Sequence, residues 1–287
     1  MSFPASDLLD LLRLERIEHN IYRGQNRDVG TGRIYGGQVL AQALVAAQNT
    51  VEADRPIHSM HGYFILAGDL SVPVVYFVDR LRDGGSFTTR RVTAIQHGRA
   101  IFNLSASFHR PEPGLEHQVE RPAAPDPDSL RPELELIREG AHALPDDIRP
   151  LVTQDRPLDI RPIDETDPYD RKVRPPRRRY WVRAAGPLGD DPLHHHAVLA
   201  YASDYGLIVS ALRPHGKSFR DPDMMVASLD HSIWFHRPFR ADEWLLYDVE
   251  SPVSCGGRGF ARGTYFTREG QVVASVAQEG LLRVRSR

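Results

Sequence analysis

Cysteine is almost absent from this sequence. Cys255 is the only one among 287 residues, so a disulfide within the chain and a metal site built from cysteines are excluded. A chain with a single thiol suits a reducing compartment, and we expect a cytoplasmic location. The last three residues, 285–287, read RSR, which is not the tripeptide that directs proteins to peroxisomes.

An excess of charge of one sign and long apolar runs are absent as well. Lys and Arg number 36 against 38 Asp and Glu, a formal net charge of -2, so we expect no nucleic-acid partner. No stretch reaches the roughly 18 uncharged apolar residues that a membrane span needs. The leucine-rich start of the chain contains Asp7, Asp10 and Glu15, which predicts an amphipathic helix rather than a signal peptide.

The chain does contain an internal repeat. Residues 83–108 can be laid on residues 255–280 with a constant offset of 172, which brings Gly98 onto Gly270. In each copy two alternating runs flank a short turn with glycine, the pattern of a β-hairpin. The same offset places the strand-like run VPVVYFV, 72–78, on WLLYDVE, 244–250. The sequence therefore predicts two halves with the same order of strands.

A helical pattern precedes each set of strands. Apolar residues recur at helical spacing in GGQVLAQALVAAQ, which starts at Gly36, and in a longer run from His194 that is expected to bend near Gly206. A long helix followed by antiparallel strands can be wrapped by its own sheet, as in a hotdog fold. We expect an α+β chain of two hotdog folds in tandem.

Prolines recur between the two halves and limit regular structure there. We expect an N-terminal hotdog domain over 1–112, a Pro-rich linker over 113–176 with one short helix near 132–140, and a C-terminal hotdog domain over 177–287.

Polar residues interrupt the apolar pattern of the second half. Gln278 falls on the strand face of Val272, Ala274 and Val276, and an unpaired amide there would cost about 1–3 kcal/mol. Asp204 lies within an apolar helical run. A carboxylate and an amide brought together could hold a water molecule, and a nearby hydroxyl would orient it.

Ser228 is the best-placed hydroxyl for this purpose, because it begins the strand SLDHSIWF. A purely structural explanation stays open at this point. Asp204 could cap or bend its helix, Gln278 could bond a backbone carbonyl, and Ser228 could simply start a strand.

Motifs in both halves resemble the acyl-CoA thioesterase II family. They are RIYGGQVLAQAL and LRDGGSFTTRRVTAIQHG in the first half, and YASDYGLI, ASLDHSIWFHRPF and VASVAQEGLLR in the second. The resemblance covers nearly the whole chain apart from the linker. It implies a double-hotdog enzyme that hydrolyses fatty acyl-CoA to free fatty acid and CoA without a covalent intermediate. Its catalytic residues would be Asp204, Ser228 and Gln278, acting on the attacking water; many members have Thr at the position of Ser228.

The resemblance also implies an acyl-CoA substrate, no metal or organic cofactor, and assembly as a homodimer or homotetramer. Backbone N–H groups at a helix N-terminus would stabilise the oxyanion, and Gly36, Gly37 and Gly206 are open candidates. Arginines near the glycine pairs are candidates for the CoA phosphates: Arg80, Arg82, Arg90, Arg91, Arg258 and Arg262.

Two other functions remain open from the sequence. A non-catalytic acyl-CoA-binding protein would keep the fold without the chemistry. A hotdog enoyl-CoA hydratase would pair the helix Asp with a His about one turn later, but YGLIVSAL follows Asp204 and contains none. Serine-nucleophile chemistry is disfavoured because no Gly-x-Ser-x-Gly motif is present. A metal at His194, His195 and His196 is disfavoured because adjacent helical residues point in different directions.

Overall fold

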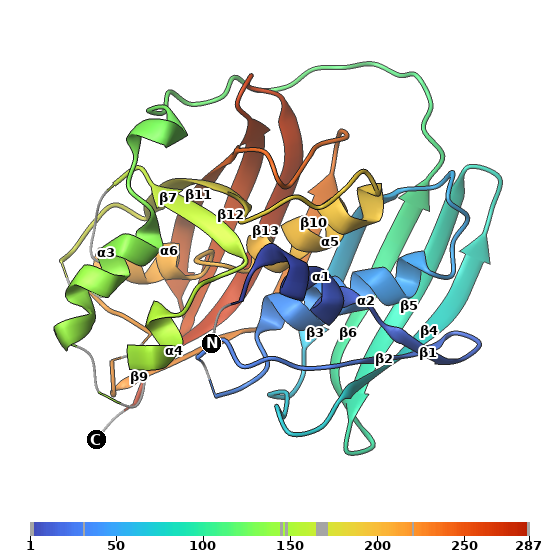
Figure 1. Cartoon of the computed structure of the whole chain (residues 1–287), viewed down its shortest axis with the longest axis horizontal. Helices are drawn as coiled ribbons and strands as arrows, with labels where there is room; N and C mark the ends of the chain where they lie inside the picture. Colours follow the sequence, from blue (N-terminus) through green and yellow to red (C-terminus); the bar gives the residue numbers. More distant parts are fainter. Residues whose placement is uncertain are drawn as a thin grey trace.

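The strands form one large antiparallel sheet that curves around two long helices (Figure 1). The computed structural model describes residues 3–30, 32–143, 146, 149–164, 172–219 and 221–285. Within these residues the sheet has 13 strands in the order β1-β2-β4-β5-β6-β3-β10-β13-β12-β11-β8-β7, with β9 paired to β13. The halves meet where β3 pairs with β10, so the core is continuous across the chain.

The first half wraps its strands around helix α2. Its elements are α1 (Ala5–Leu12), β1 (Glu15–Glu18), β2 (Ile21–Gly24), α2 (Gly36–Gln48), β3 (Ile57–Phe64), β4 (Val74–Asp83), β5 (Phe87–Gln96) and β6 (Arg99–His109). The second half repeats this plan around helix α5. Its elements are β8 (Arg177–Ala184), α5 (Pro192–Ser203), α6 (Val209–Leu212), η3 (Arg213–His215), β9 (Met224–Ser228), β10 (Asp230–Phe235), β11 (Leu245–Cys255), β12 (Arg258–Thr267) and β13 (Val272–Val284).

The hairpins predicted from the repeat are present in both halves. In the first, β5 pairs with β6 up to Gln96 and Arg99, leaving His97 and Gly98 as a two-residue turn. Both turn residues have positive φ, 50° and 69°, as a tight hairpin turn requires. Gly270 occupies the matching turn between β12 and β13 with φ 96°.

The strand face predicted to point inward, that of Val276 and Gln278, is buried in the structure, and the first half has a matching face. Along β6 and β13 the even-numbered residues are buried between Phe102 and Phe108 and between Val272 and Leu282. Gln278 lies on this face and is fully buried. The sheet therefore presents an amide to the helices at the place where the first half presents an apolar side chain.

The long helix predicted from His194 is divided in the structure. α5 ends at Ser203, and Gly206 adopts the left-handed region at φ 69°, which stops the helix. The chain then forms α6, η3 and β9 before it enters β10. The first half passes from α2 to β3 through residues 49–56 alone. The second half thus carries an insertion at the end of its central helix.

The segment between the halves holds more structure than the predicted short helix. That helix is present as α3 (Glu133–Gly140), and the segment also contains η1 (Pro127–Ser129), η2 (Ala141–Ala143), α4 (Arg149–Thr153) and β7 (Leu158–Pro162). β7 pairs with β8 and so extends the sheet. The limits 1–112, 113–176 and 177–287 stay a prediction.

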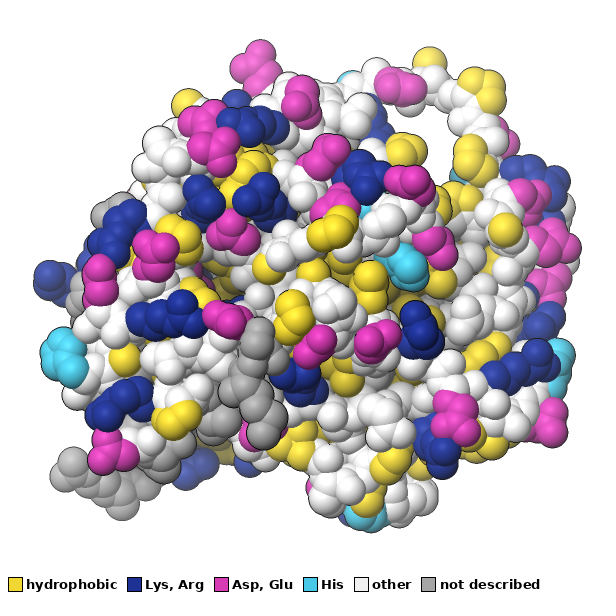
Figure 2. Space-filling view, viewed as in Figure 1, with side chains coloured by type: hydrophobic (Ala, Val, Ile, Leu, Met, Phe, Trp, Pro, Cys, Tyr) yellow, Lys and Arg dark blue, Asp and Glu magenta, His cyan; other side chains and the backbone are white. Residues whose placement is uncertain are grey.

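Charges of both signs are interspersed on the face seen in Figure 2. Among the described helices, none is long and apolar enough to cross a membrane.

Candidate active site

Asp204 lies directly after the last residue of α5, at the C-cap of the helix. Its side chain is only 7% exposed. The helix end is held by three tyrosines whose hydroxyls donate to alternate carbonyls around it. Tyr35 donates to the carbonyl of residue 201 at 3.0 Å, Tyr247 to that of residue 203 at 3.3 Å, and Tyr180 to that of residue 205 at 2.6 Å. These bonds satisfy carbonyls that a helix end leaves without intrahelical partners, and they immobilise the backbone of Asp204.

The same tyrosines stay protonated beside the carboxylate. Burial, and then the charge of Asp204, raise the pKa of Tyr35 well above its usual value. Burial is also the main cause that raises the pKa of Tyr180 and Tyr247. The hydroxyls are therefore permanent donors to the helix end rather than acids or bases.

The carboxylate of Asp204 faces the first turn of α2. A Cβ placed on Gly36 would lie 2.8 Å from Oδ2 of Asp204, and one on Gly37 would lie 2.4 Å from the backbone oxygen of Tyr201. Only glycine lets the helices approach this closely. The N–H groups of Gln38 and Val39 bond the carbonyl of Tyr35, whereas within the described residues no acceptor pairs with those of Gly36 and Gly37. The start of α2 thus offers two backbone donors next to a carboxylate.

Gln278 supplies the amide that Asp204 contacts. Its Nε2 donates to Oδ1 of Asp204 at 2.7 Å. Its Oε1 is buried and, among the described residues, accepts no hydrogen bond. An acceptor left this way costs about 1–3 kcal/mol unless a small molecule or water satisfies it. The buried amide is therefore held by Asp204 on one side and open to a donor on the other.

His231 completes this cluster and was not a candidate from the sequence. It lies on β10 next to Ser232, whose partner on β13 is Ala277, the neighbour of Gln278. Its side chain is fully buried and has Nδ1 3.3 Å from Nε2 of Gln278 and 3.9 Å from Oδ1 of Asp204. Its Nε2 lies 2.8 Å from the hydroxyl of Ser203. Gln278 was identified as a polar residue on an apolar strand face. His231 could have been found in the same way, because it shares an alternating face with the buried Ile233 and Phe235.

Ser228 is near the cluster but not in direct contact with it. It is the last residue of β9, in the insertion, and pairs with Gly280 on β13. Directly paired residues of an antiparallel sheet point to the same face, so Ser228 shares the face of Gln278. Among the described residues it makes no hydrogen bond to Asp204 or Gln278. The structure therefore joins two of the three predicted residues and places the third one strand away on the same face.

A buried carboxylate from the segment between the halves supports the residue after Asp204. Glu133 on α3 has a side chain only 4% exposed and accepts a hydrogen bond from the hydroxyl of Tyr205. Arg156 and Arg178 lie 3.4 Å and 3.3 Å from its carboxylate oxygens. The segment is thus anchored to the end of α5 by charge as well as by packing.

His58, His61 and the histidine triplet of α5 lie away from this cluster. His61 pairs with Ser232, on the outer face of the sheet, and bonds its hydroxyl at 3.1 Å. His58 bonds the hydroxyl of Ser107 at 2.8 Å. In the histidine triplet, His194 and His195 bond the carbonyls of residues 188 and 189, while His196 packs edge-on against Phe235. Within the described ranges, no group of three potential ligands could hold a metal ion.

Most of the arginines considered for CoA phosphates are paired across neighbouring strands. Arg90 is buried, with its guanidinium bonded to Thr50 and Asp83, so it is a structural residue. Three others form ion pairs with carboxylates, namely Arg91 with Asp79, Arg258 with Glu279 and Arg262 with Glu250. None of these pairs identifies a phosphate site.

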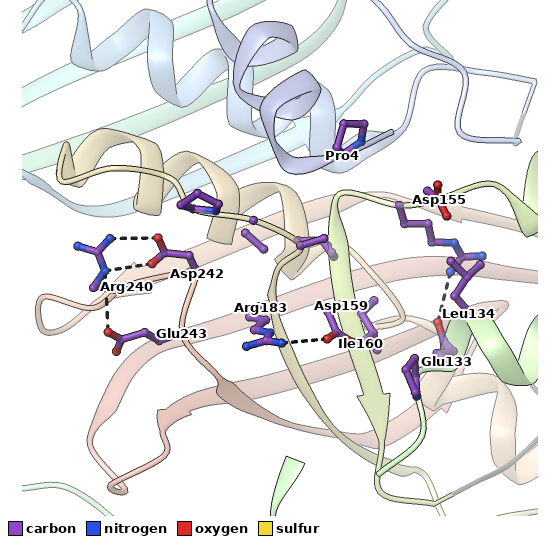
Figure 3. A pocket seen from close by; sticks show the side chains of 17 residues that line it. Pro4, Glu133, Leu134, Asp155, Asp159, Ile160, Arg183, Arg240, Asp242 and Glu243 are labelled. Atoms are coloured by element: carbon purple, nitrogen blue, oxygen red, sulfur yellow. Dashed lines mark hydrogen bonds and ion pairs between the residues drawn. The ribbon is translucent and has the colours of Figure 1, made fainter. Parts of the chain in front are cut away.

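A cavity of about 820 Å³ lies apart from the cluster, between the N-terminal segment, α3, β7 and the loops around α5 (Figure 3). Its charged lining consists of three arginines and five acidic residues: Glu133, Asp155, Arg156, Asp159, Arg183, Arg240, Asp242 and Glu243. Arg183 pairs with Asp159 at 3.5 Å and Arg240 with Asp242 at 3.0 Å. This excess of negative charge disfavours an anionic ligand such as CoA.

Known proteins match the chain along its whole length. Residues 25–109 match the acyl-CoA thioesterase N-terminal domain and residues 149–281 match the acyl-CoA thioesterase family. Acyl-CoA thioesterase 2 of Haemophilus influenzae is 40% identical over 283 residues, 99% of each chain. The chain belongs to the acyl-CoA thioesterase II family. Acyl-coenzyme A thioesterase 8 of Mus musculus is 40% identical as well, over 96% of this chain and 88% of the mouse protein.

Solved structures agree with this membership. A crystal structure of an acyl-CoA thioesterase II from Mycobacterium marinum has a TM-score of 0.80 and 42% sequence identity, and the match covers 97% of this chain and 99% of that one. A protein described as having a hot dog fold, from Alicyclobacillus acidocaldarius, has a TM-score of 0.78 at 17% identity, which shows the fold alone. The predicted α+β double hotdog is confirmed, and the chain is an acyl-CoA thioester hydrolase.

Proposed function

We propose that this enzyme hydrolyses fatty acyl-CoA to free fatty acid and CoA by direct attack of a water molecule that Asp204 activates. The observation that carries the proposal is the position of the Asp204 carboxylate. It lies between the amide of Gln278 and the first turn of α2, on a backbone that three tyrosine hydroxyls immobilise. A fixed carboxylate beside unpaired donors can deprotonate water and stabilise the charge that attack creates.

The reaction proceeds in two steps. Water attacks the thioester carbonyl carbon while one of its protons passes to Asp204, and the carbonyl oxygen becomes an oxyanion. The tetrahedral species then collapses, the C–S bond breaks, and the CoA sulfur takes the proton from Asp204. The carboxylate is regenerated, and the reaction uses neither a covalent acyl-enzyme nor a cofactor.

The N–H groups of Gly36 and Gly37 are proposed to hold the oxyanion. They belong to the first turn of a 13-residue helix, where unpaired donors and the helix dipole both favour negative charge. Gly206, the third candidate, follows Asp204 at the opposite, C-terminal end of α5. That end of a helix carries partial negative charge, which disfavours an oxyanion.

Gln278 and Ser228 are proposed to orient the attacking water. Oε1 of Gln278, to which no described protein group donates, can accept a hydrogen bond from the second O–H of the water that Asp204 deprotonates. Ser228 can contribute its hydroxyl from the neighbouring strand on the same face. Holding the water in line is worth several orders of magnitude in rate when the geometry is well fixed.

The structure does not favour a hydratase, although it brings a histidine near Asp204. Both ring nitrogens of His231 face protein groups, Ser203 and Gln278, and its side chain is fully buried. A histidine that acts on an enoyl substrate has to reach it. Hydrolysis therefore remains the function that the cluster supports.

The test compares Asp204→Asn with Asp191→Asn by thiol release from acyl-CoAs between acetyl and palmitoyl. Asp191 caps the other end of α5 by accepting from the N–H of Leu193, a role that Asn fills equally well. We expect a loss of kcat of about 10²–10⁴ for Asp204→Asn and little change for Asp191→Asn. Equal turnover by both variants would refute the role of Asp204, and no turnover by the wild type would favour an acyl-CoA-binding protein.

Single-turnover hydrolysis in H₂¹⁸O tests for one covalent intermediate, an anhydride at Asp204 that water opens at the enzyme carbonyl. Direct attack places ¹⁸O in the fatty acid during the first turnover. An anhydride at Asp204, opened by water at the enzyme carbonyl, would leave the first product unlabelled and the label on the enzyme.

A cytoplasmic location and assembly as a homodimer or homotetramer are proposed as well, from the family resemblance and the single thiol. Light scattering coupled to size-exclusion chromatography tests the assembly, and a monomeric mass would refute it.

A further inference from the structure

The imidazole of His231 is buried and contacts Ser203, Gln278 and Asp204. The residue is 0% exposed, contacts Gln278 across the β10–β13 pair, and reaches Ser203 in the last turn of α5. It therefore connects the strand that carries Gln278 with the helix that presents Asp204.

The hydrogen bonds around Ser203 determine which ring nitrogen carries the proton. The Ser203 hydroxyl donates to the carbonyl of Ala200 at 2.9 Å, so its single proton is already used. The same oxygen lies 2.8 Å from Nε2 of His231 and can only accept there. His231 is thus the Nε2–H tautomer, and its Nδ1 is an acceptor.

This tautomer determines the orientation of the Gln278 amide. Nε2 of Gln278 has two protons and two acceptors, Oδ1 of Asp204 at 2.7 Å and Nδ1 of His231 at 3.3 Å. The reversed amide would direct Oε1 at a carboxylate and at a nitrogen lone pair, with no proton between them. Oε1 is consequently held on the other side, where no described protein group donates to it.

We propose that His231 is a positioning residue of this thioesterase, which holds the Gln278 amide so that Oε1 faces the attacking water. The inference rests on the proposed function, because it assumes that Gln278 orients this water. His231 does not touch the substrate; its effect on the rate passes through Gln278. Burial lowers the pKa of His231 to about 4, against the opposing effect of Asp204, so Nδ1 keeps its lone pair at neutral pH.

Two substitutions separate the two contacts of the ring. In His231→Asn the side-chain oxygen can take the place of Nδ1 and accept from Gln278, while the bond to Ser203 is lost. In His231→Gln the amide nitrogen can take the place of Nε2 and donate to Ser203, while the acceptor for Gln278 is lost. His236→Gln is the matched control, since His236 bonds the hydroxyl of Ser275 at 2.9 Å on the exposed side of the sheet.

The experiment measures kcat, KM and the thermal midpoint of each variant with one acyl-CoA that the wild type hydrolyses. We expect kcat of His231→Gln to fall about 10- to 100-fold with KM nearly unchanged, and kcat of His231→Asn to fall less than about threefold. His236→Gln should match the wild type. Equal losses in both His231 variants, in step with their thermal midpoints, would show a purely structural role and overturn the proposal.

A double-mutant cycle shows whether the effect passes through Gln278. In a Gln278→Ala background, His231→Gln should cause no further loss of kcat, because the amide it positions is gone. Independent, multiplicative losses would refute the positioning role. A wild-type enzyme without activity would refute the proposed function instead, so the two failures are distinguishable.

Discussion

Gly36→Ala should impair catalysis without unfolding the enzyme. The added Cβ would lie 2.8 Å from Oδ2 of Asp204 and 3.1 Å from the ring of Phe64. Ordinary contact begins at 3.4 Å, so the carboxylate oxygen has to move by about 0.6 Å. Because a misplacement of about 1 Å can cost 10²-fold in rate, we expect kcat to fall between about 10- and 100-fold.

Alanine keeps the backbone N–H of residue 36, so this loss would report on the position of Asp204 and not on the removal of an oxyanion donor. The gain in helix propensity, about 0.5–1 kcal/mol, offsets part of the steric cost, and the thermal midpoint should change little. Gly140→Ala is the control, since a Cβ there meets no atom within 4 Å. Wild-type kcat in Gly36→Ala, at an unchanged thermal midpoint, would refute the inferred proximity of Gly36 and Asp204.

Three further outcomes are expected. In thiol-release assays Ser228→Ala should lower kcat about tenfold and Ser228→Thr should retain it, because only the hydroxyl is needed; equal rates would exclude Ser228 from the site. Chemical denaturation should show that Glu133→Ala, which removes the buried carboxylate that Arg156 and Arg178 both contact, loses about 3–5 kcal/mol, whereas the exposed Glu135→Ala loses under about 0.5 kcal/mol. Burial lowers the pKa of His231 and His196 to about 4, below the value of about 6.5 in the unfolded chain. Between pH 4 and pH 6.5 the unfolded chain therefore binds more protons than the folded chain. The contribution of these two histidines to the free energy of unfolding should therefore be constant above pH 6.5 and fall by about 1.4 kcal/mol per pH unit per histidine down to pH 4; a flat profile would contradict this.

Local pattern was sufficient to predict most of the fold. The repeat at an offset of 172 located the matching hairpins, and the alternation around Val276 gave the correct inward face of β13. Where the structure goes beyond this prediction, long-range pairing decided the outcome. β7 joins the sheet from a segment predicted as linker, because its partner β8 offers an open edge that a short strand can cover.

The candidate site was only partly accessible from the sequence. Gln278 and Asp204 were identifiable because each interrupts an apolar pattern, and the same argument would have found His231. Their roles as a cluster were not identifiable. Gln278 and Asp204 are separated by 74 residues and meet only because the fold brings β13 to the end of α5.

The sequence by itself determined the two-fold plan, the inward faces and the polar residues that have to be satisfied inside, because periodicity and burial cost are local properties. Only the tertiary structure decided which of those residues meet. The approach of α2 to α5 at Gly36 and Gly37 brings unpaired backbone donors to Asp204, and the β10–β13 pairing sets His231 against Gln278. Hydrogen bonds act over about 3 Å, so this chemistry exists only once the packed helices and paired strands have fixed such distances.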